Sequence, residues 1–201
     1  MTIDKDDLLN SILASIDRIH NVSSDEIPNV NLYMDQLTTL MDGLLAHSTR
    51  NPGEDKILTK TMINNYAKND LLPPPDKKKY SREHILMLIF IYYSKGIMSI
   101  TDIHTMLKPL CDRYFHSDGP VNLCSIYDEV FSMEGERTED LKKNLSTMFE
   151  RAQKTFEDCS EEDREILQRF AFIFMLGYDV YTKRLLIEKL LDEFGDVSSP
   201  E

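Results

Sequence analysis

The sequence predicts a mainly α-helical protein, and three observations lead to this expectation. Apolar residues recur at helical spacing through most of the 201 residues, whereas the alternation that is typical of strands is scarce. Only 7 glycines and 8 prolines interrupt the chain. Hydrophobic residues make up 41% of the composition, an ordinary share for a globular protein. We therefore expect a folded helical core rather than wholesale disorder.

Two amphipathic helices are predicted in the amino-terminal quarter. Leu8–Ile19 carries apolar residues at helical spacing, and a polar connector follows it. Asn31 is the predicted N-cap of the second helix, whose apolar face extends over Met34–Leu45. Residues 48–55 contain Asn-Pro-Gly and are predicted to form a loop.

Residues 59–71 are predicted to form a short helix with two different faces. Thr59 is a suitable N-cap, and Pro73 is expected to end the helix. Ile63 and Tyr66 lie on the face that we expect to pack in a core. The polar residues lie mainly on the other face: Lys60, Thr61, Asn64, Asn65 and Lys68.

A basic segment and a strongly apolar helix come next. Lys77, Lys78 and Lys79 follow a block of three prolines and precede Tyr80. Ser81 is the predicted N-cap of a helix that closes at Lys95-Gly96. The apolar run in this helix is so continuous that we expect burial on nearly all sides.

The remaining helices are predicted from their caps and periodicity. Ser99–Asp102 resembles a capping box and opens a short helix. Pro120–Met133 and Thr138–Phe156 are predicted as two separate helices. Two more are expected over Ser160–Gly177 and Thr182–Phe194, with a break at the glycine.

Charge divides the chain into three segments. The net charge is −12, yet residues 56–110 carry nine basic and four acidic side chains. Residues 1–55 and 111–201 are both strongly acidic. We predict amino-terminal helices, a central module and a carboxyl-terminal helical lobe with these bounds. A basic patch on an acidic body can bind a polyanion in one orientation, although an acidic surface also serves solubility alone.

Several classes of site have no support in the sequence. The three cysteines are widely spaced and form no Cys-x-x-Cys, so neither a disulfide scaffold nor a zinc ribbon is expected. His104, Cys111 and His116 fit no zinc spacing. Nucleotide-binding and nucleophile motifs are missing, so we expect no enzyme, metal or cofactor. Without a signal peptide or an apolar run of about twenty residues, we expect a cytoplasmic protein without a membrane span.

The central segment resembles the MerR-type winged helix-turn-helix. Thr59 lies at the family's cap, Tyr66 at the second residue of its aromatic pair, and Leu71-Leu72-Pro73 at its Leu-Leu-Pro stop. Tyr80–His84 matches the end of the wing with the next cap, and Gly96–Ile103 matches the turn into the fourth helix. The likeness covers about a quarter of the chain.

The segment also departs from the MerR pattern. Asn65 replaces the first aromatic residue, and Asp70 replaces the glycine before Leu-Leu. The wing is shorter and lacks its glycine. The first helix of the pair would end near His47 and be followed by a longer connector than the family uses. The chain as a whole resembles an uncharacterised, all-helical family of bacterial proteins that shares the Met62–Tyr66 and Lys77–His84 patterns.

This resemblance implies a transcription regulator that binds double-stranded DNA as a homodimer. Residues 59–71 would form the recognition helix and residues 76–80 a short basic wing. Asparagine can pair bidentately with adenine, and lysines neutralise phosphates. The plainer interpretation is a solvated helix face and a solvated loop. The candidate DNA contacts are Lys60, Thr61, Asn64, Asn65, Lys68, Lys77, Lys78, Lys79, Tyr80 and Arg82.

Other functions remain open at this stage. Thr138–Phe156 or Phe170–Tyr181 is a candidate dimer interface, with packing inside a monomeric core as the alternative. A small apolar effector near Gly177 is a further possibility, less favoured than core packing. The main alternative to a regulator is a protein-interaction adaptor that has this fold and does not bind DNA.

Overall fold

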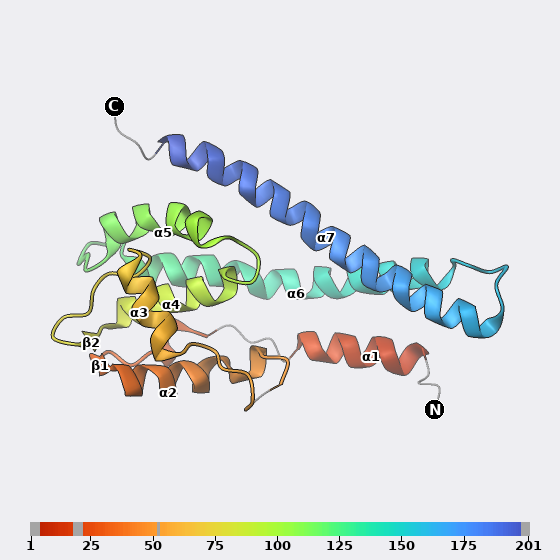
Figure 1. Ribbon diagram of the computed structural model, residues 1–201, viewed down its shortest axis with the longest axis horizontal. Coiled ribbons are helices and arrows are strands. Elements are labelled where there is room, and N and C mark those ends of the chain that lie inside the picture. Colours follow the sequence, from red (N-terminus) through yellow and green to blue (C-terminus); the bar gives the residue numbers. More distant parts are fainter. Residues whose placement is uncertain (1–4, 18–21, 52, 198–201) are drawn as a thin grey trace. The chain divides into compact units, whose positions relative to one another are not determined.

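The computed structural model describes residues 5–17, 22–51 and 53–197, which are mainly helical as predicted (Figure 1). The chain divides into two compact units, one of His20–Ser132 with Glu188–Glu201 and the other of Met1–Ile19 with Met133–Ile187. The α-helices of the described residues are α1 (Lys5–Ile16), α2 (Met34–Leu45), α3 (Lys60–Lys68), α4 (Arg82–Ser94), α5 (Ile100–Tyr114), α6 (Leu123–Gln153) and α7 (Glu161–Val197).

The larger unit is built around α4, which is buried along most of its length as its apolar run predicts. Leu37 and Met41 of α2 and Ile63 of α3 pack in the same core as Ile85 and Leu88 of α4. Helix α2 therefore buries its apolar face against helices of residues 56–110.

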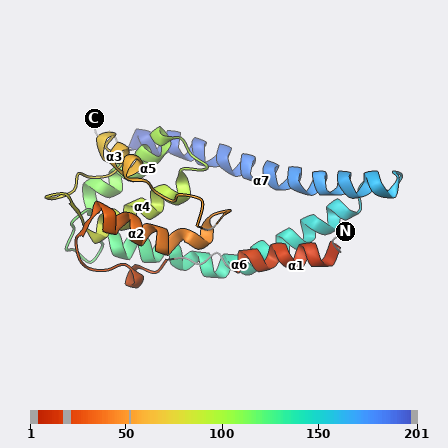
Figure 2. The same cartoon turned by 60° about the horizontal axis from the view of Figure 1, so that its bottom comes forward.

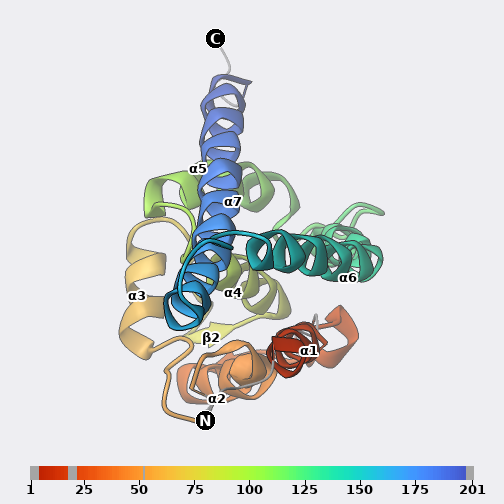
Figure 3. The same ribbon diagram turned by 90° about the vertical axis from the view of Figure 1, so that its right-hand side faces the viewer.

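A two-stranded antiparallel sheet joins the start of α2 to the start of α4. In this sheet β1 (Leu32–Tyr33) pairs with β2 (Lys79–Tyr80), and Leu32 lies opposite Tyr80. Strand β2 contacts both α2 and α4 (Figure 3). The prediction of Asn31 as N-cap is wrong, because strand pairing keeps the next two residues extended. Helix α2 begins only at Met34.

Helix α5 and the start of α6 complete this unit. The predicted capping box is confirmed, since the Asp102 backbone N–H donates to Ser99 Oγ at 3.1 Å. Ile103 on α5 and Tyr127 on α6 are buried in the core. The Tyr127 hydroxyl donates to the Val22 carbonyl at 2.7 Å and so joins α6 to the start of the unit.

The smaller unit contains α1, the second part of α6 and most of α7. Its core is small, with Phe149 and Phe172 packed edge to face at 5.3 Å between ring centres. Leu9 and Ile12 of α1 pack against this cluster, so α1 runs alongside α6 (Figure 2). Lys142 on α6 forms an ion pair with Asp17 at 2.5 Å.

Two predicted helix breaks are wrong. Helix α6 runs without interruption through residues 134–137, and α7 continues through Gly177 to Val197. A glycine costs a helix interior only about 1 kcal/mol relative to alanine, and neither stretch contains proline. This cost is small enough for the rest of each long helix to offset it, so neither helix ends at its glycine. None of the helices that the structure describes has the length and apolarity needed to cross a membrane.

Candidate functional site

Helix α3 shows the two faces that its sequence predicts. Thr59 Oγ1 accepts a hydrogen bond from the Met62 backbone N–H at 3.2 Å, which confirms this residue as the N-cap. Ile63 and Tyr66 are buried, and burial raises the pKa of the Tyr66 hydroxyl. The exposed side chains are the predicted ones: Lys60, Thr61, Asn64, Asn65 and Lys68.

The end of α3 differs from the prediction. The helix ends at Lys68, five residues before Pro73, because Asp70 adopts a left-handed conformation with a φ of 55°. The Leu71 backbone N–H then donates to the Tyr66 carbonyl at 2.9 Å, and Leu71 enters the core. Glycine would adopt the conformation of Asp70 without strain.

The predicted basic wing is a tight turn at the start of β2. The Lys79 backbone N–H donates to the Asp76 carbonyl at 2.8 Å, so Lys77 and Lys78 occupy the two central positions. Their φ angles are 47° and 65°, which match a type I′ turn. Both side chains are exposed. The turn thus directs two adjacent ammonium groups to solvent.

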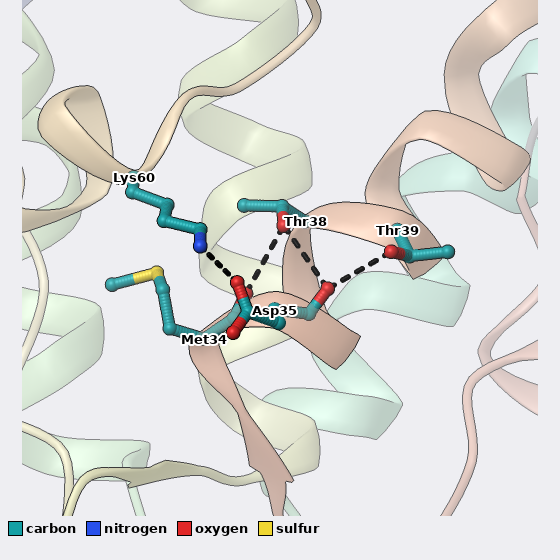
Figure 4. Close-up of polar contacts among 5 residues, drawn as sticks. All are labelled: Met34, Asp35, Thr38, Thr39 and Lys60. Carbon is teal, nitrogen blue, oxygen red and sulfur yellow. Dashed lines mark hydrogen bonds and ion pairs between the residues drawn. The ribbon is translucent and has the colours of Figure 1, made fainter.

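Lys60 and Lys79 bring α3 and the turn together at the start of α2. The Lys60 ammonium forms an ion pair with the Asp35 carboxylate on the first turn of α2 (Figure 4). The Lys79 ammonium lies 5.1 Å from the centre of the Tyr33 ring. Tyr33 and Asp35 are two residues apart, so one side chain from the amino-terminal end of α3 and one from β2 both reach the start of α2. We call Lys60, Asn64, Lys77, Lys78 and their exposed neighbours on α3 the basic surface.

Asp35 places a negative charge within this basic surface. The first turn of α2 is held by side-chain hydroxyls: Thr39 Oγ1 donates to the Asp35 carbonyl at 2.9 Å, and Thr38 Oγ1 donates to the Met34 carbonyl at 3.2 Å (Figure 4). The Lys60 and Asp35 side chains are 59% and 79% exposed, so their pair contributes little to stability. Its main effect is to neutralise one cation locally.

Two of the predicted DNA contacts have structural positions. Tyr80 is only 3% exposed and packs edge to face against His84 in the core, so its ring cannot stack on a base. Arg82 is half-buried, and its Nη2 donates to the Ser24 carbonyl at 2.5 Å. Burial therefore keeps Tyr80 from contact with DNA, whereas a DNA contact of the half-buried Arg82 stays a prediction.

Buried His84 fastens the proline block to the start of α4. Its Nδ1 accepts a hydrogen bond from the Ser81 backbone N–H at 2.9 Å, so the proton lies on Nε2, which donates to the Pro73 carbonyl at 3.2 Å. Burial lowers the pKa of His84, against the opposing effect of the carbonyls of Pro73 and Pro74. The neutral ring therefore holds the chain that leads into the turn.

Sequence reasoning missed the contribution of Tyr33, Asp35 and His84. The position of Asp35 in the first turn of a predicted helix could have indicated its exposure, because acidic residues are favourable there. Its pairing with Lys60 depends on the tertiary packing of α2 against α3. Among the described residues, no group of three or more His, Cys, Asp or Glu side chains is arranged to hold a metal ion.

Comparisons with known proteins identify a family without an assigned activity. A family model described as "Domain of unknown function (DUF1836)" matches residues 22–130. The match covers more than half of the chain, so the protein belongs to this family. It includes the complete basic surface, α4 and α5. No curated protein matches the chain. No solved structure matches it either.

Proposed function

We propose that the protein is a transcription regulator that binds double-stranded DNA through its basic surface. The observation that carries the proposal is that Lys60 of α3 and Lys79 of β2 both contact the start of α2, with the exposed Lys77–Lys78 turn directly before Lys79. Asn64 and Asn65 are exposed on α3 and have the chemistry to pair with adenine. The turn supplies two cations for phosphates beside them.

The order of elements supports a MerR-like winged helix-turn-helix as the fold of this module. Strand β1, helices α2 and α3, strand β2 and helix α4 follow one another in the chain, and β2 returns to pair with β1. Helix α2 corresponds to the first helix of the pair and α3 to the recognition helix. Homodimerisation belongs to the same proposal, since two copies would read two half-sites.

A selection from a random pool of duplexes tests the proposal. The wild-type protein should enrich a pseudo-palindromic motif, with affinity that falls steeply as salt rises. Changing Asn64 and Asn65 to Ala should flatten the sequence preference and leave the salt dependence unchanged, because these amides contact bases. Asn144→Ala, at an exposed position on α6, is the matched control and should behave as wild type. No retention of duplex at roughly 50 mM salt would refute DNA binding.

A protein-interaction adaptor is the second candidate, and a groove on α2 favours it. The groove has a volume of about 500 Å³ and is lined by Pro28, Leu32 and Leu40 with polar residues at its edge. Val30 and Tyr33 beside it are more than half exposed. Apolar side chains next to a neutralised Lys60 suit a protein partner better than a phosphate backbone. Failure of the DNA selection would favour this function.

The effector predicted near Gly177 has a corresponding groove in the smaller unit. Met148 of α6 and Phe174, Met175 and Tyr178 of α7 line a space of about 400 Å³. This volume lies within the range of small-molecule sites, and flexible methionines suit an apolar ligand. A small apolar effector is therefore an optional part of the regulator proposal. A thermal-shift screen with apolar compounds tests it, and a Met148→Glu variant should abolish any hit.

A further inference from the structure

Helix α7 carries an apolar face that the rest of the smaller unit does not cover. We call this the outer face of α7. Gly177 lies at its centre, because residues three, four and seven positions away share one side of a helix. The members of the outer face are 55–67% exposed: Ile166, Phe170, Ile173, Phe174, Val180 and Tyr181.

The opposite side of α7 is fixed against α6. Gln168 and Phe172 are 2% and 6% exposed. Gln168 Nε2 donates to the carbonyl of Gln153 at 2.7 Å and to that of Thr155 at 3.0 Å. Gln168 is nine residues from Gly177, which places it half a turn round the helix. The contacts that hold α7 in its unit therefore leave most of the outer face exposed.

The outer face has the size of one side of a stable interface. Six side chains that each expose about 60% of roughly 200 Å² amount to an apolar area on the order of 700 Å². A typical monomer has a largest apolar patch of about 300–600 Å². A standard protein–protein interface buries about 800 Å² on each partner.

Two charge pairs beside the outer face form within α7. Arg169 forms an ion pair with Glu165 at 2.6 Å, and Lys183 forms one with Asp179 at 2.6 Å. These four residues therefore add no net charge that would select a strongly charged partner. The aromatic rings of Phe170 and Phe174 lie nearly parallel, at 6.0 Å between centres, and present a broad apolar surface.

We propose that a second copy of this chain covers the outer face, with the two α7 helices crossing antiparallel at Gly177. A two-fold axis there brings the turn with Ile173 and Phe174 of one copy against the turn with Val180 and Tyr181 of the other, so apolar groups meet on both sides of the axis. Glycine weakens a helix interior, and among the described residues no atom outside the surrounding turns of α7 lies within 4 Å of the position where a Cβ would stand at Gly177. A close crossing of two helices explains a glycine at this point.

This pairing does not depend on DNA binding, so the first test uses the full chain without DNA. Sedimentation equilibrium should give twice the 23.4 kDa mass of one chain. Phe170→Glu should raise the dimer dissociation constant at least about 30-fold, because it places a charge within the apolar interface, two helical turns from the crossing point. The matched control is Leu186→Glu. Leu186 is 63% exposed and lies on the side of α7 opposite to Gly177. This control should leave the constant unchanged.

A Gly177→Ala variant tests the crossing point, because its two effects have opposite signs. Alanine strengthens the helix, so in the monomeric Phe170→Glu background it should raise the melting temperature by about 2 °C. In the otherwise wild-type chain it should raise the dimer dissociation constant about tenfold, because the added methyl separates the helices. A wild-type monomer at roughly 100 μM would overturn the proposal. A dimer that Phe170→Glu or Gly177→Ala leaves intact would overturn it as well.

Discussion

Replacing Lys77-Lys78 by Asn-Gly separates the charge of the turn from its conformation. The two lysines have φ angles of 47° and 65°, a region that costs residues with a Cβ about 1–2 kcal/mol each. Asn-Gly is the pair that type I′ turns prefer. The flexibility of glycine in the unfolded chain offsets part of the gain. We expect the variant to be more stable by about 1 kcal/mol, with a melting temperature about 2–4 °C higher.

The same variant should bind DNA more weakly. Each phosphate contact contributes about −0.9 to the slope of log affinity against log salt, so losing two contacts reduces the slope by about 1.8 per bound copy. This corresponds to a loss of about 60-fold in affinity at roughly 0.1 M salt and about 20-fold at roughly 0.2 M. Fluorescence anisotropy with a labelled duplex over a salt series measures both quantities, and thermal unfolding checks stability.

A matched control removes the same two charges from another part of the chain. Lys143 and Lys154 are both exposed, and changing both to Ala should alter the slope by much less than 1.8. The reasoning is refuted if the Asn-Gly variant is at least as stable as wild type and binds DNA with the same slope. Such a result would mean that the turn does not contact phosphates. A lower melting temperature would instead refute the assignment of strain to the turn.

Three further predictions concern single residues. Asp35→Asn should increase DNA affinity several-fold at low salt, because it frees Lys60 from its ion pair, and fluorescence anisotropy measures this increase. The free energy of unfolding, measured with urea, should change by less than about 1 kcal/mol. Weaker DNA binding would contradict the prediction. Asp70→Gly should raise the free energy of unfolding by about 1 kcal/mol, since the φ of 55° suits glycine, and a loss of stability would contradict the left-handed assignment. His84 has a lowered pKa in the folded protein, so the unfolded chain binds the proton first as pH falls. Stability should therefore be fully present above about pH 6.5 and decline below it, and His84→Gln, which keeps an acceptor for Ser81, should reduce that decline.

Local signals were sufficient to predict the helices that form the candidate site. Thr59 and Ser99 accept the capping hydrogen bonds expected of them, and the spacing of Ile63 and Tyr66 correctly identified the buried face of α3. These features depend on residues within one or two turns of each other, which is the range that sequence patterns describe. The burial of α4 was also predictable, because a helix with apolar residues on all sides is stable in water only when it is buried.

Features that depend on distant residues were not predictable in the same way. Each strand of the sheet has two residues, too few for an alternating pattern, and their pairing joins segments nearly fifty residues apart. Arg82 has the residue type of a phosphate contact, but its environment includes a carbonyl 58 positions earlier. Gly177 suggests a helix end by its residue type, but such an end also needs a left-handed conformation, which Gly177 does not adopt. In each case the residue type allows more than one structural role, and tertiary packing decides which role the residue has.

Asp35 gives the basic surface a property that a simple cluster of lysines would lack. A phosphate that approaches Lys60 must displace a carboxylate that is already paired with it, so electrostatic attraction alone is reduced at this position. Contacts of Asn64 and Asn65 with bases are not reduced in the same way, because amides carry no charge. Within the proposed function, Asp35 therefore weakens non-specific binding more than specific binding. Within the same proposal, the net negative charge of the segments on either side of residues 56–110 would also reduce non-specific attraction to DNA.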